Sequence, residues 1–163
     1  FITSRVFGNS FFDRQLLSRG IAISKGREQI LLNEIKIKTY ANKHYTKINE
    51  NMKISQVIKT LIKGKVTEAY IISKNNKFLG KIRLMDIINK KEQNILNLKQ
   101  SNPMVIDPEL SLLNTIKKLS KFVGESVPII EKSNQEFIGI ISENDVLEAY
   151  LEISNEINHI EKD

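Results

Sequence analysis

The sequence FIGIISEND at residues 137–145 has a counterpart, FLGKIRLMD, at residues 78–86. Phe, Gly and Asp occupy the same three places in both stretches, which are 59 residues apart. Further upstream, apolar residues recur at a separation of 58: Ile54, Ile58 and Leu61 correspond to Leu112, Ile116 and Leu119. The chain therefore contains an internal repeat, and a repeat of this size is a supersecondary unit that shares a core with its copy.

Each copy predicts the element order β-α-β-β-α. The predicted strands are 46–48, 69–72 and 78–82 in the first copy, and 104–106, 128–130 and 137–141 in the second. The apolar residues of the first helix in each copy follow the spacing of a one-sided helix, and Ser111 is the expected N-cap in the second copy. A closing helix is expected at about 84–90 and from 143 into the 150s. The predicted fold class is therefore α+β.

Composition and charge limit the function classes. The 163 residues are 40% hydrophobic and 27% charged, which is typical of a globular protein. The absence of cysteine excludes disulfides and thiolate metal sites. Residues 1–100 carry a net charge of +13 and residues 101–163 carry −7. The lysines of the basic half, Lys81 among them, alternate with apolar residues and lack interleaved stacking aromatics, so we interpret them as a solvated face and expect no nucleic-acid partner.

Residues that form catalytic or metal sites are scarce. The two histidines, His44 and His159, lie far apart, and no His or acidic cluster has metal-ligand spacing. We expect His44 in a surface loop and His159 at a solvated helix end. No nucleophile elbow or phosphate-binding glycine loop is present. The sequence predicts no enzyme activity and no metal site.

The repeated Gly-x-x-x-x-x-Asp stretch, within its β-α-β-β-α setting, resembles the CBS domain, two of which form a Bateman module with pseudo-two-fold symmetry. Residues 139–145 contain the family's Gly-h-h-Ser/Thr-x-x-Asp signature (h is an apolar residue). The first copy has Arg83 where the family has the hydroxyl residue. The resemblance implies that the cleft between the copies takes an adenine nucleotide (AMP, ADP or ATP) as a regulatory ligand, with no cofactor required.

The resemblance also implies which residues form the nucleotide site. Asp145 is expected to hold the ribose hydroxyls and Ser142 to lie near the phosphate, while Glu143 disfavours the extra charge of ATP. The opposing wall is expected from the first copy: Tyr45, Thr46, Lys65, Val66 and Thr67. A second, weaker site is expected at Asp86 and Arg83. However, Ser142 and Asp145 also have the spacing of a helix capping box, which requires no ligand.

The leading segment resembles the linker that follows the membrane part of prokaryotic ClC-type chloride channels and transporters. The residues concerned are 12–21, FDRQLLSRGI, and 25–28, KGRE. This resemblance implies the cytoplasmic regulatory domain of an integral inner- or plasma-membrane protein, with the membrane domain of the same chain as partner. The alternative is the CBS-pair sensor of another transporter or of a nucleotide-regulated enzyme. The chain begins with Phe1 rather than Met, and we interpret it as a fragment.

These expectations divide the chain into four parts: a partly helical linker at 1–33, with a helix at 11–19; a first repeat at 34–97; a second repeat at 98–155; and a polar tail at 156–163. The linker is rich in apolar residues, so we expect it to dock on the repeats. ClC-type parents are dimers, which implies a homodimer. We expect its interface on the closing helices, at Ile87, Ile88, Val146 and Leu147.

Overall fold

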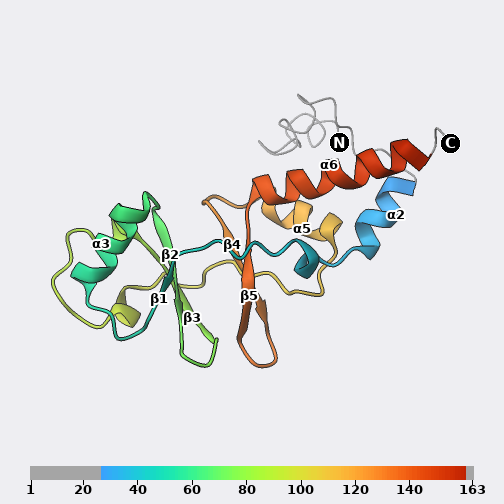
Figure 1. Ribbon diagram of the computed structural model, residues 1–163. Helices are drawn as coiled ribbons and strands as arrows, with labels where there is room; N and C mark the ends of the chain where they lie inside the picture. Colours follow the sequence, from blue (N-terminus) through green and yellow to red (C-terminus); the bar gives the residue numbers. More distant parts are fainter. Residues whose placement is uncertain (1–26, 161–163) are drawn as a thin grey trace, which may run out of the picture. The chain divides into compact units, whose positions relative to one another are not determined.

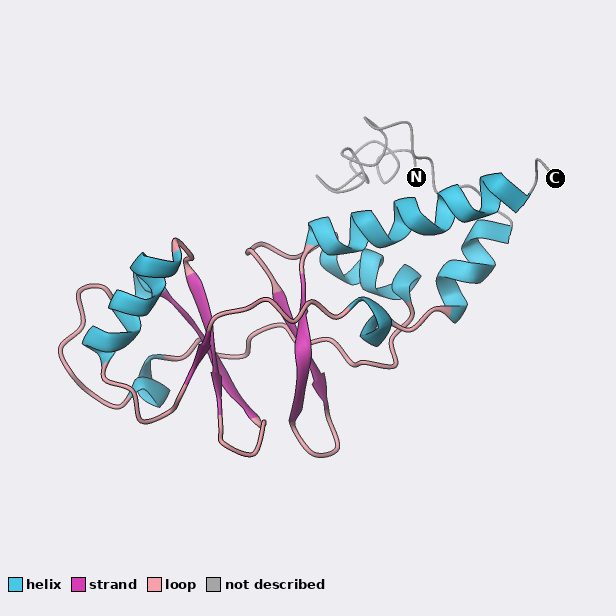
Figure 2. Ribbon diagram, in the orientation of Figure 1, coloured by secondary structure: helices cyan, strands magenta, loops and turns pink. Residues whose placement is uncertain are grey.

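The computed structural model describes residues 27–160, which form two compact units (Figure 1). Unit 1 contains the described residues up to Tyr40, Glu109–Ser126 and the chain from Ile141 onward. Unit 2 contains Ala41–Pro108 and Val127–Ile140. Unit 2 therefore holds the strands of both repeats, apart from the last residue of β5, whereas unit 1 is built almost entirely of helices (Figure 2). The predicted helix at 11–19 lies outside the described residues.

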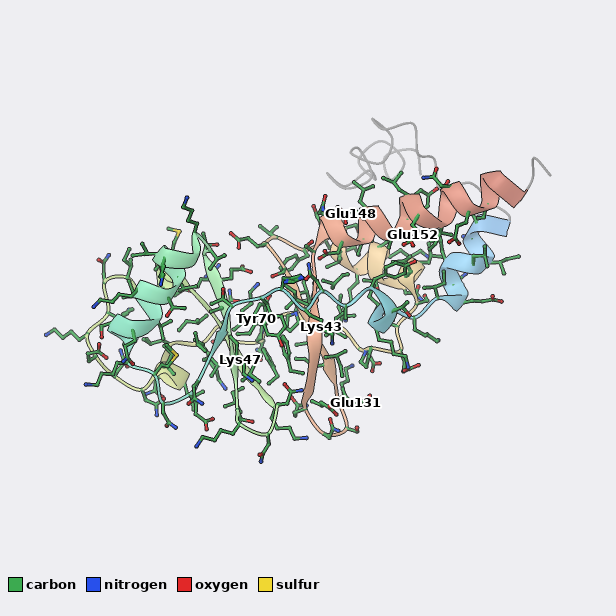
Figure 3. All side chains as sticks on the ribbon, in the orientation of Figure 1. Lys43, Lys47, Tyr70, Glu131, Glu148 and Glu152 are labelled. Atoms are coloured by element: carbon green, nitrogen blue, oxygen red, sulfur yellow. The ribbon has the colours of Figure 1, made fainter. Side chains whose placement is uncertain are left out.

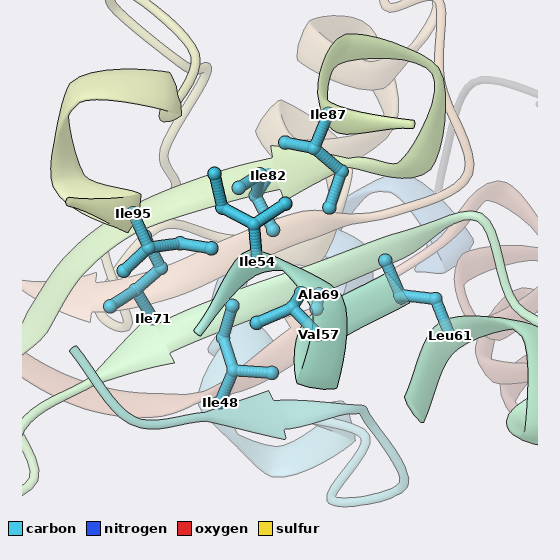
Figure 4. Packing of buried hydrophobic residues seen from close by; sticks show 9 residues of the cluster. All are labelled: Ile48, Ile54, Val57, Leu61, Ala69, Ile71, Ile82, Ile87 and Ile95. Atoms are coloured by element: carbon cyan, nitrogen blue, oxygen red, sulfur yellow. The ribbon is translucent and has the colours of Figure 1, made fainter. Parts of the chain in front are cut away.

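The first repeat forms a three-stranded sheet in unit 2, ordered β1 (Lys47–Ile48), β2 (Glu68–Ile72) and β3 (Phe78–Arg83). β1 pairs parallel to β2, and β2 pairs antiparallel to β3. The parallel pair requires a crossover, which α3 (Ile54–Gly64) supplies. The apolar spacing of α3 buries Ile54, Val57 and Leu61 against the sheet. Figure 4 shows this core: Ile48, Ile54, Val57, Leu61, Ala69, Ile71, Ile82, Ile87 and Ile95.

The second repeat contributes a hairpin to unit 2, with strands β4 (Val127–Glu131) and β5 (Glu136–Ile141). Its predicted first strand is reduced to one parallel bridge, between Ile106 and Ile129. Pro103 and Pro108 flank this segment and lack the N–H groups that a longer ladder needs. The two hairpins are joined because Phe78 N–H donates to the carbonyl of Gln135 and Phe137 N–H to that of Asn76, both at 2.9 Å.

Unit 1 comprises α2 (Arg27–Glu34), the 3-10 helix η1 (Ile37–Tyr40), α5 (Leu112–Leu119) and α6 (Glu143–Ile160). The predicted cap of α5 is confirmed, because Ser111 Oγ accepts the N–H of Asn114 at 3.2 Å. α2 contacts both α5 and α6, and Leu32 is fully buried. The described end of the linker segment is therefore docked. α6 continues through the described part of the predicted tail.

The predicted dimer interface needs correction. Ile87, Val146 and Leu147 are buried within the chain itself, and only Ile88 of the four residues is exposed. The first closing helix is also shorter than predicted, because α4 spans only Leu84–Ile87 and a 3-10 helix, η2 (Ile95–Leu98), follows after a loop. These helices do not present the apolar face that we expected.

Among residues 27–160, no helix is long and apolar enough to cross a membrane.

The N-terminus of α3 is capped from a distant loop. Its N-cap residue, Lys53, has no acceptor in its side chain. Instead, the Glu92 carboxylate accepts the N–H groups of Ile54 and Ser55, at 3.0 and 2.9 Å. The hydrogen bond from Ser55 is the main reason that the pKa of Glu92 lies below its ordinary value. The ionised carboxylate therefore fixes the loop to the helix.

This cap predicts a pH-dependent difference between the protein and its Glu92→Gln variant. Because the folded state lowers the pKa of Glu92, its stabilising effect is complete above the unfolded-state value and is lost as the pH falls through the folded-state value. Urea unfolding should show the variant to be less stable at pH 7 and equal to the protein in strong acid. An equal difference at both pH values would contradict the cap.

Candidate nucleotide-binding site

The Ser142–Asp145 end of the second-repeat signature lies in unit 1, at the start of α6. Ser142 donates from both its N–H (2.8 Å) and its hydroxyl (2.6 Å) to Oδ2 of Asp145. Asp145 N–H donates back to Ser142 Oγ at 3.2 Å. The capping box considered from the sequence is confirmed. The cap thus fixes the orientation of the carboxylate to which a ribose diol would bind.

The helix that starts there has an acidic, exposed side. Glu148 and Glu152 lie along α6 with exposed side chains (Figure 3), and Asn144 Nδ2 donates to Glu148 at 2.8 Å. Partial burial raises the pKa of Glu143, the residue beside Ser142. Even so, a carboxyl group rather than a cation stands next to the signature, which disfavours a ligand with several phosphates.

The signature of the first repeat lies in unit 2 and is organised differently. Arg83 Nε and Nη2 donate to the two carboxylate oxygens of Asp86, at 2.8 and 3.1 Å. This bidentate pair raises the pKa of Arg83, first through the hydrogen bond and then through the charge of Asp86. The Arg83 side chain is 51% exposed, so water screens the pair. Both oxygens of Asp86 are nevertheless used by Arg83, whereas a ribose diol needs them as acceptors.

The residues predicted for the opposing wall all lie in unit 2, as do Arg83 and Asp86. The Thr46 carbonyl accepts the N–H of Tyr70 at 2.9 Å, and the Thr67 carbonyl accepts the N–H of Leu84 at 2.8 Å. Thr67 is therefore held beside the first-repeat signature. Ser142 and Asp145 belong to the other unit. That these residues share one site with Asp145 stays a prediction.

The other three wall residues have structural roles of their own. The Tyr45 ring meets that of Phe137 edge-on, with centroids 4.9 Å apart. Val66 is partly buried and packs against the core beneath α3. Lys65 is the C-cap of α3, with the left-handed φ of 52°. His44 lies in an exposed loop, as predicted, and its N–H donates to Asn42 Oδ1.

A buried ion pair beside the first-repeat signature is the main feature that the sequence analysis missed. Lys81 Nζ lies 2.7 Å from the Glu68 carboxylate, and their side chains are 4% and 7% exposed. Lys81 Nζ also lies 5.8 Å from the ring centroid of Tyr70. Lys81 is therefore not part of a solvated lysine face. The repeat contained a signal for this burial. The equivalent residue of the second copy, 59 positions after Lys81, is Ile140, an apolar residue that is also buried.

A surface groove in unit 2 does not contain any of the predicted site residues. It has a volume of about 780 Å³ and borders Phe78, Leu79 and Gly80 at the start of β3, with the segment from Leu96 to Pro103 opposite. Gly80 is the first residue of the first-repeat signature, but the predicted site residues of that signature, Arg83 and Asp86, lie at and just beyond the other end of β3. In the part of the chain that the structure describes, no group of three or more His or acidic residues has a geometry suited to a metal ion.

The family model of the CBS domain matches residues 37–92 and 97–152. The chain therefore belongs to the CBS domain family and carries two copies in tandem, as predicted. The repeat boundaries predicted at 34–97 and 98–155 stay predictions. Among curated proteins, none matches the chain.

Solved CBS structures share the fold at low sequence identity. CbpB in complex with c-di-AMP has a TM-score of 0.70 and 16% identity, covering 82% of this chain and 95% of that one. CBSX2 in complex with AMP has a TM-score of 0.61 and 17% identity, covering 74% and 98%. The cystathionine beta-synthase pair domain of a proposed Mg²⁺ transporter from Shewanella oneidensis has a TM-score of 0.63 and 17% identity, covering 91% and 86%. These similarities show the tandem CBS fold.

The second repeat suggests a test of the buried pair, since Val127 and Ile140 stand where Glu68 and Lys81 stand in the first. Lys81→Ile alone should destabilise the protein by about 3–5 kcal/mol, because it leaves a buried carboxylate without its cation. The double variant Glu68→Val, Lys81→Ile should recover most of that loss. Urea unfolding of the two single variants and the double variant measures both effects. A double variant as unstable as the sum of the singles would show that the two side chains are not coupled.

Proposed function

We propose that this CBS pair is a regulatory domain that binds an adenine nucleotide through the Ser142–Asp145 end of α6. The observation that carries the proposal is the capped, intact signature, in which a fixed carboxylate is in place to accept hydrogen bonds from a cis-diol. The ligands named for CbpB and CBSX2, c-di-AMP and AMP, both contain adenosine phosphate, which supports this ligand class. The proposed role is regulatory rather than catalytic.

The proposed parent protein is a ClC-type chloride channel or chloride/proton exchanger, with this domain on its cytoplasmic side. Glu28, the last residue of the linker stretch that resembles those proteins, is held by α6: Tyr150 and Ser154 donate their hydroxyls to its carboxylate at 3.3 and 2.9 Å. Asp145 and Ser154 lie on the same helix, about 14 Å apart along its axis. α6 thus connects the proposed ligand residue to the segment that would lead to the membrane domain.

A second host also has support. The chain resembles the CBS pair of a proposed Mg²⁺ transporter over 91% of its length, so a cation transporter is the alternative parent. The residues encoded upstream of Phe1 distinguish the two. Hydrophobic spans with the glycine-rich anion motifs of ClC proteins would support the first proposal, and spans without them would contradict it. The homodimer implied by the ClC resemblance stays a prediction, without the interface that we first expected.

Titration calorimetry with AMP, ADP and ATP tests the ligand. Asp145→Ala should weaken binding by about tenfold or more, because it removes charge-assisted hydrogen bonds to the ribose. Asp86→Ala should have a smaller effect, because Arg83 already uses that carboxylate. AMP or ADP should bind at least as well as ATP. Asp145→Asn is the matched control. It keeps an acceptor for the Ser142 cap while removing the charge, so it separates the loss of the charge from the loss of the cap. Absence of heat with every nucleotide at millimolar concentration would leave Asp145 as a helix cap alone.

The α6 connection predicts that Glu28→Ala releases α2. Both hydroxyl hydrogen bonds are lost, so amide exchange across residues 27–34 should become faster while α5 stays protected. The pKa of Tyr150, which burial and then Glu28 raise to about 12, should also fall, although burial keeps it above 10. Tyr150→Phe is the control, because it removes one hydrogen bond and keeps the ring. Unchanged exchange in α2 would show that Glu28 does not hold the linker.

A further inference from the structure

The two hairpins of unit 2 meet at residues that are equivalent in the two repeats. Lys77 and Glu136, which are 59 residues apart in the sequence, form an isolated antiparallel bridge. Phe78 and Phe137, the residues that follow them, each donate an N–H across this bridge at 2.9 Å. Exchanging the two hairpins would leave this pattern unchanged. A local two-fold axis therefore passes between Lys77 and Glu136.

The bridge places two opposite charges on one face. Its two hydrogen bonds are made by the flanking residues, so Lys77 and Glu136 form a non-hydrogen-bonded pair, in which the side chains are closest. The Cβ atoms of such a pair are about 5 Å apart. Glu136 is exposed and Lys77 is half-buried. The two side chains therefore attract each other across the axis, at a position that water can reach.

The other contacts at this axis do not distinguish one repeat from the other. Phe78 and Phe137, whose rings stack with centroids 6.0 Å apart, are the same residue type. The backbone hydrogen bonds depend on strand geometry and not on the side chains. The first hairpin could thus pair in the same way with the first hairpin of a second chain. Such exchange of equivalent elements is a hazard in proteins built from repeats.

We propose that the opposite charges of Lys77 and Glu136 direct each hairpin to the unlike hairpin and prevent like repeats of two chains from pairing during folding. Pairing two first hairpins would place Lys77 opposite Lys77, and pairing two second hairpins would place Glu136 opposite Glu136. Like charges at directly opposite positions are destabilising, and a dimer of like-paired repeats contains both repulsions. The inference goes beyond the proposed function, since it concerns how the fold is specified, whether or not a nucleotide binds.

Charge reversal tests the proposal, because it removes the distinction between the hairpins without changing the backbone. In Lys77→Glu, every possible pairing places two carboxylates opposite each other. In Glu136→Lys, every pairing places two ammonium groups opposite each other. The advantage of the unlike pairing is lost in both variants. The double variant Lys77→Glu, Glu136→Lys exchanges the two charges and restores that advantage, so it is the matched control.

A single cysteine can report the pairing of like repeats, since the chain itself contains none. Asn75→Cys places this cysteine in the exposed turn of the first hairpin, two residues before Lys77. The 163-residue chain with this change, and its three charge variants, are refolded from urea and treated with a bismaleimide. A cross-linked dimer on a denaturing gel then requires two first hairpins to be close. Cross-linking through any other interface of the folded chain should be equal in all four proteins.

The ratio of cross-linked dimer to monomer should rise on the order of tenfold in each single charge variant, because two repulsions no longer oppose the like pairing alone. It should return to the original value in the double variant. Added salt should raise the ratio in the chain with the original charges, since salt screens exposed charges. Urea unfolding of the same four proteins should show both single variants to be less stable and the double variant to recover.

Equal cross-linking in all four proteins would overturn the proposal. It would assign the choice of partner to packing instead, since the first repeat has Tyr70 where the second has Ile129. A double variant that cross-links as strongly as the single variants would overturn it as well. Should a single variant fail to refold, recovery of folding in the double variant is the expected result, and failure of the double variant also contradicts the proposal.

Discussion

The packing of Phe137 against the first repeat is the contact on which the arrangement of strands in unit 2 depends. Its ring stacks on that of Phe78, at 6.0 Å between centroids, and also contacts Tyr45 and Tyr70. These residues belong to three segments that are distant in sequence, so burying one ring ties the second hairpin to the sheet of the first repeat. Aromatic contacts of this kind contribute beyond the area that they bury. The backbone hydrogen bonds from Phe137 N–H to the Asn76 carbonyl and from Phe78 N–H to the Gln135 carbonyl then set the register of the two hairpins.

The two copies of the repeat differ in the positions of their charged residues. In the second copy, the signature carboxylate caps a long helix, and strands β4 and β5 are charged only at Glu131 and Glu136, the residues next to their turn. In the first copy, Arg83 holds the signature carboxylate, and the neighbouring strands carry the buried pair of Glu68 and Lys81. A buried ion pair contributes little net stability compared with apolar residues, but its geometry restricts which partners the strands accept. The equivalent carboxylate thus caps a helix in one copy and neutralises an arginine in the other.

Unit 1 links the leading segment to the second repeat through a polar contact supported by burial. Leu32 provides the apolar part of the docking, and Glu28 provides the specificity, since its two oxygens receive the hydroxyls of Tyr150 and Ser154. Burial, and then the charges of Glu152 and Glu156 on α6, raise the pKa of Tyr40 in η1. α6 therefore presents hydroxyl groups to α2 on one side and carboxylates on another.

The sequence alone determined the strands of each hairpin and the caps at Ser111 and Ser142, because each depends on residues within a few positions of one another. It also determined the repeat, since equivalent residues recur 58 or 59 positions apart, and the fold class, which follows from the order of the elements. The outcomes that only the tertiary structure decided depend on distant partners. Glu92 replaces a missing cap on α3 from 38 residues away. Lys81 is buried in an ion pair with Glu68, which lies diagonally across from it on the neighbouring strand. Ile62 fits the apolar period of α3 but stays 57% exposed. Local periodicity predicts which side of a helix is apolar, but the elements that pack against that side decide how much of it is buried.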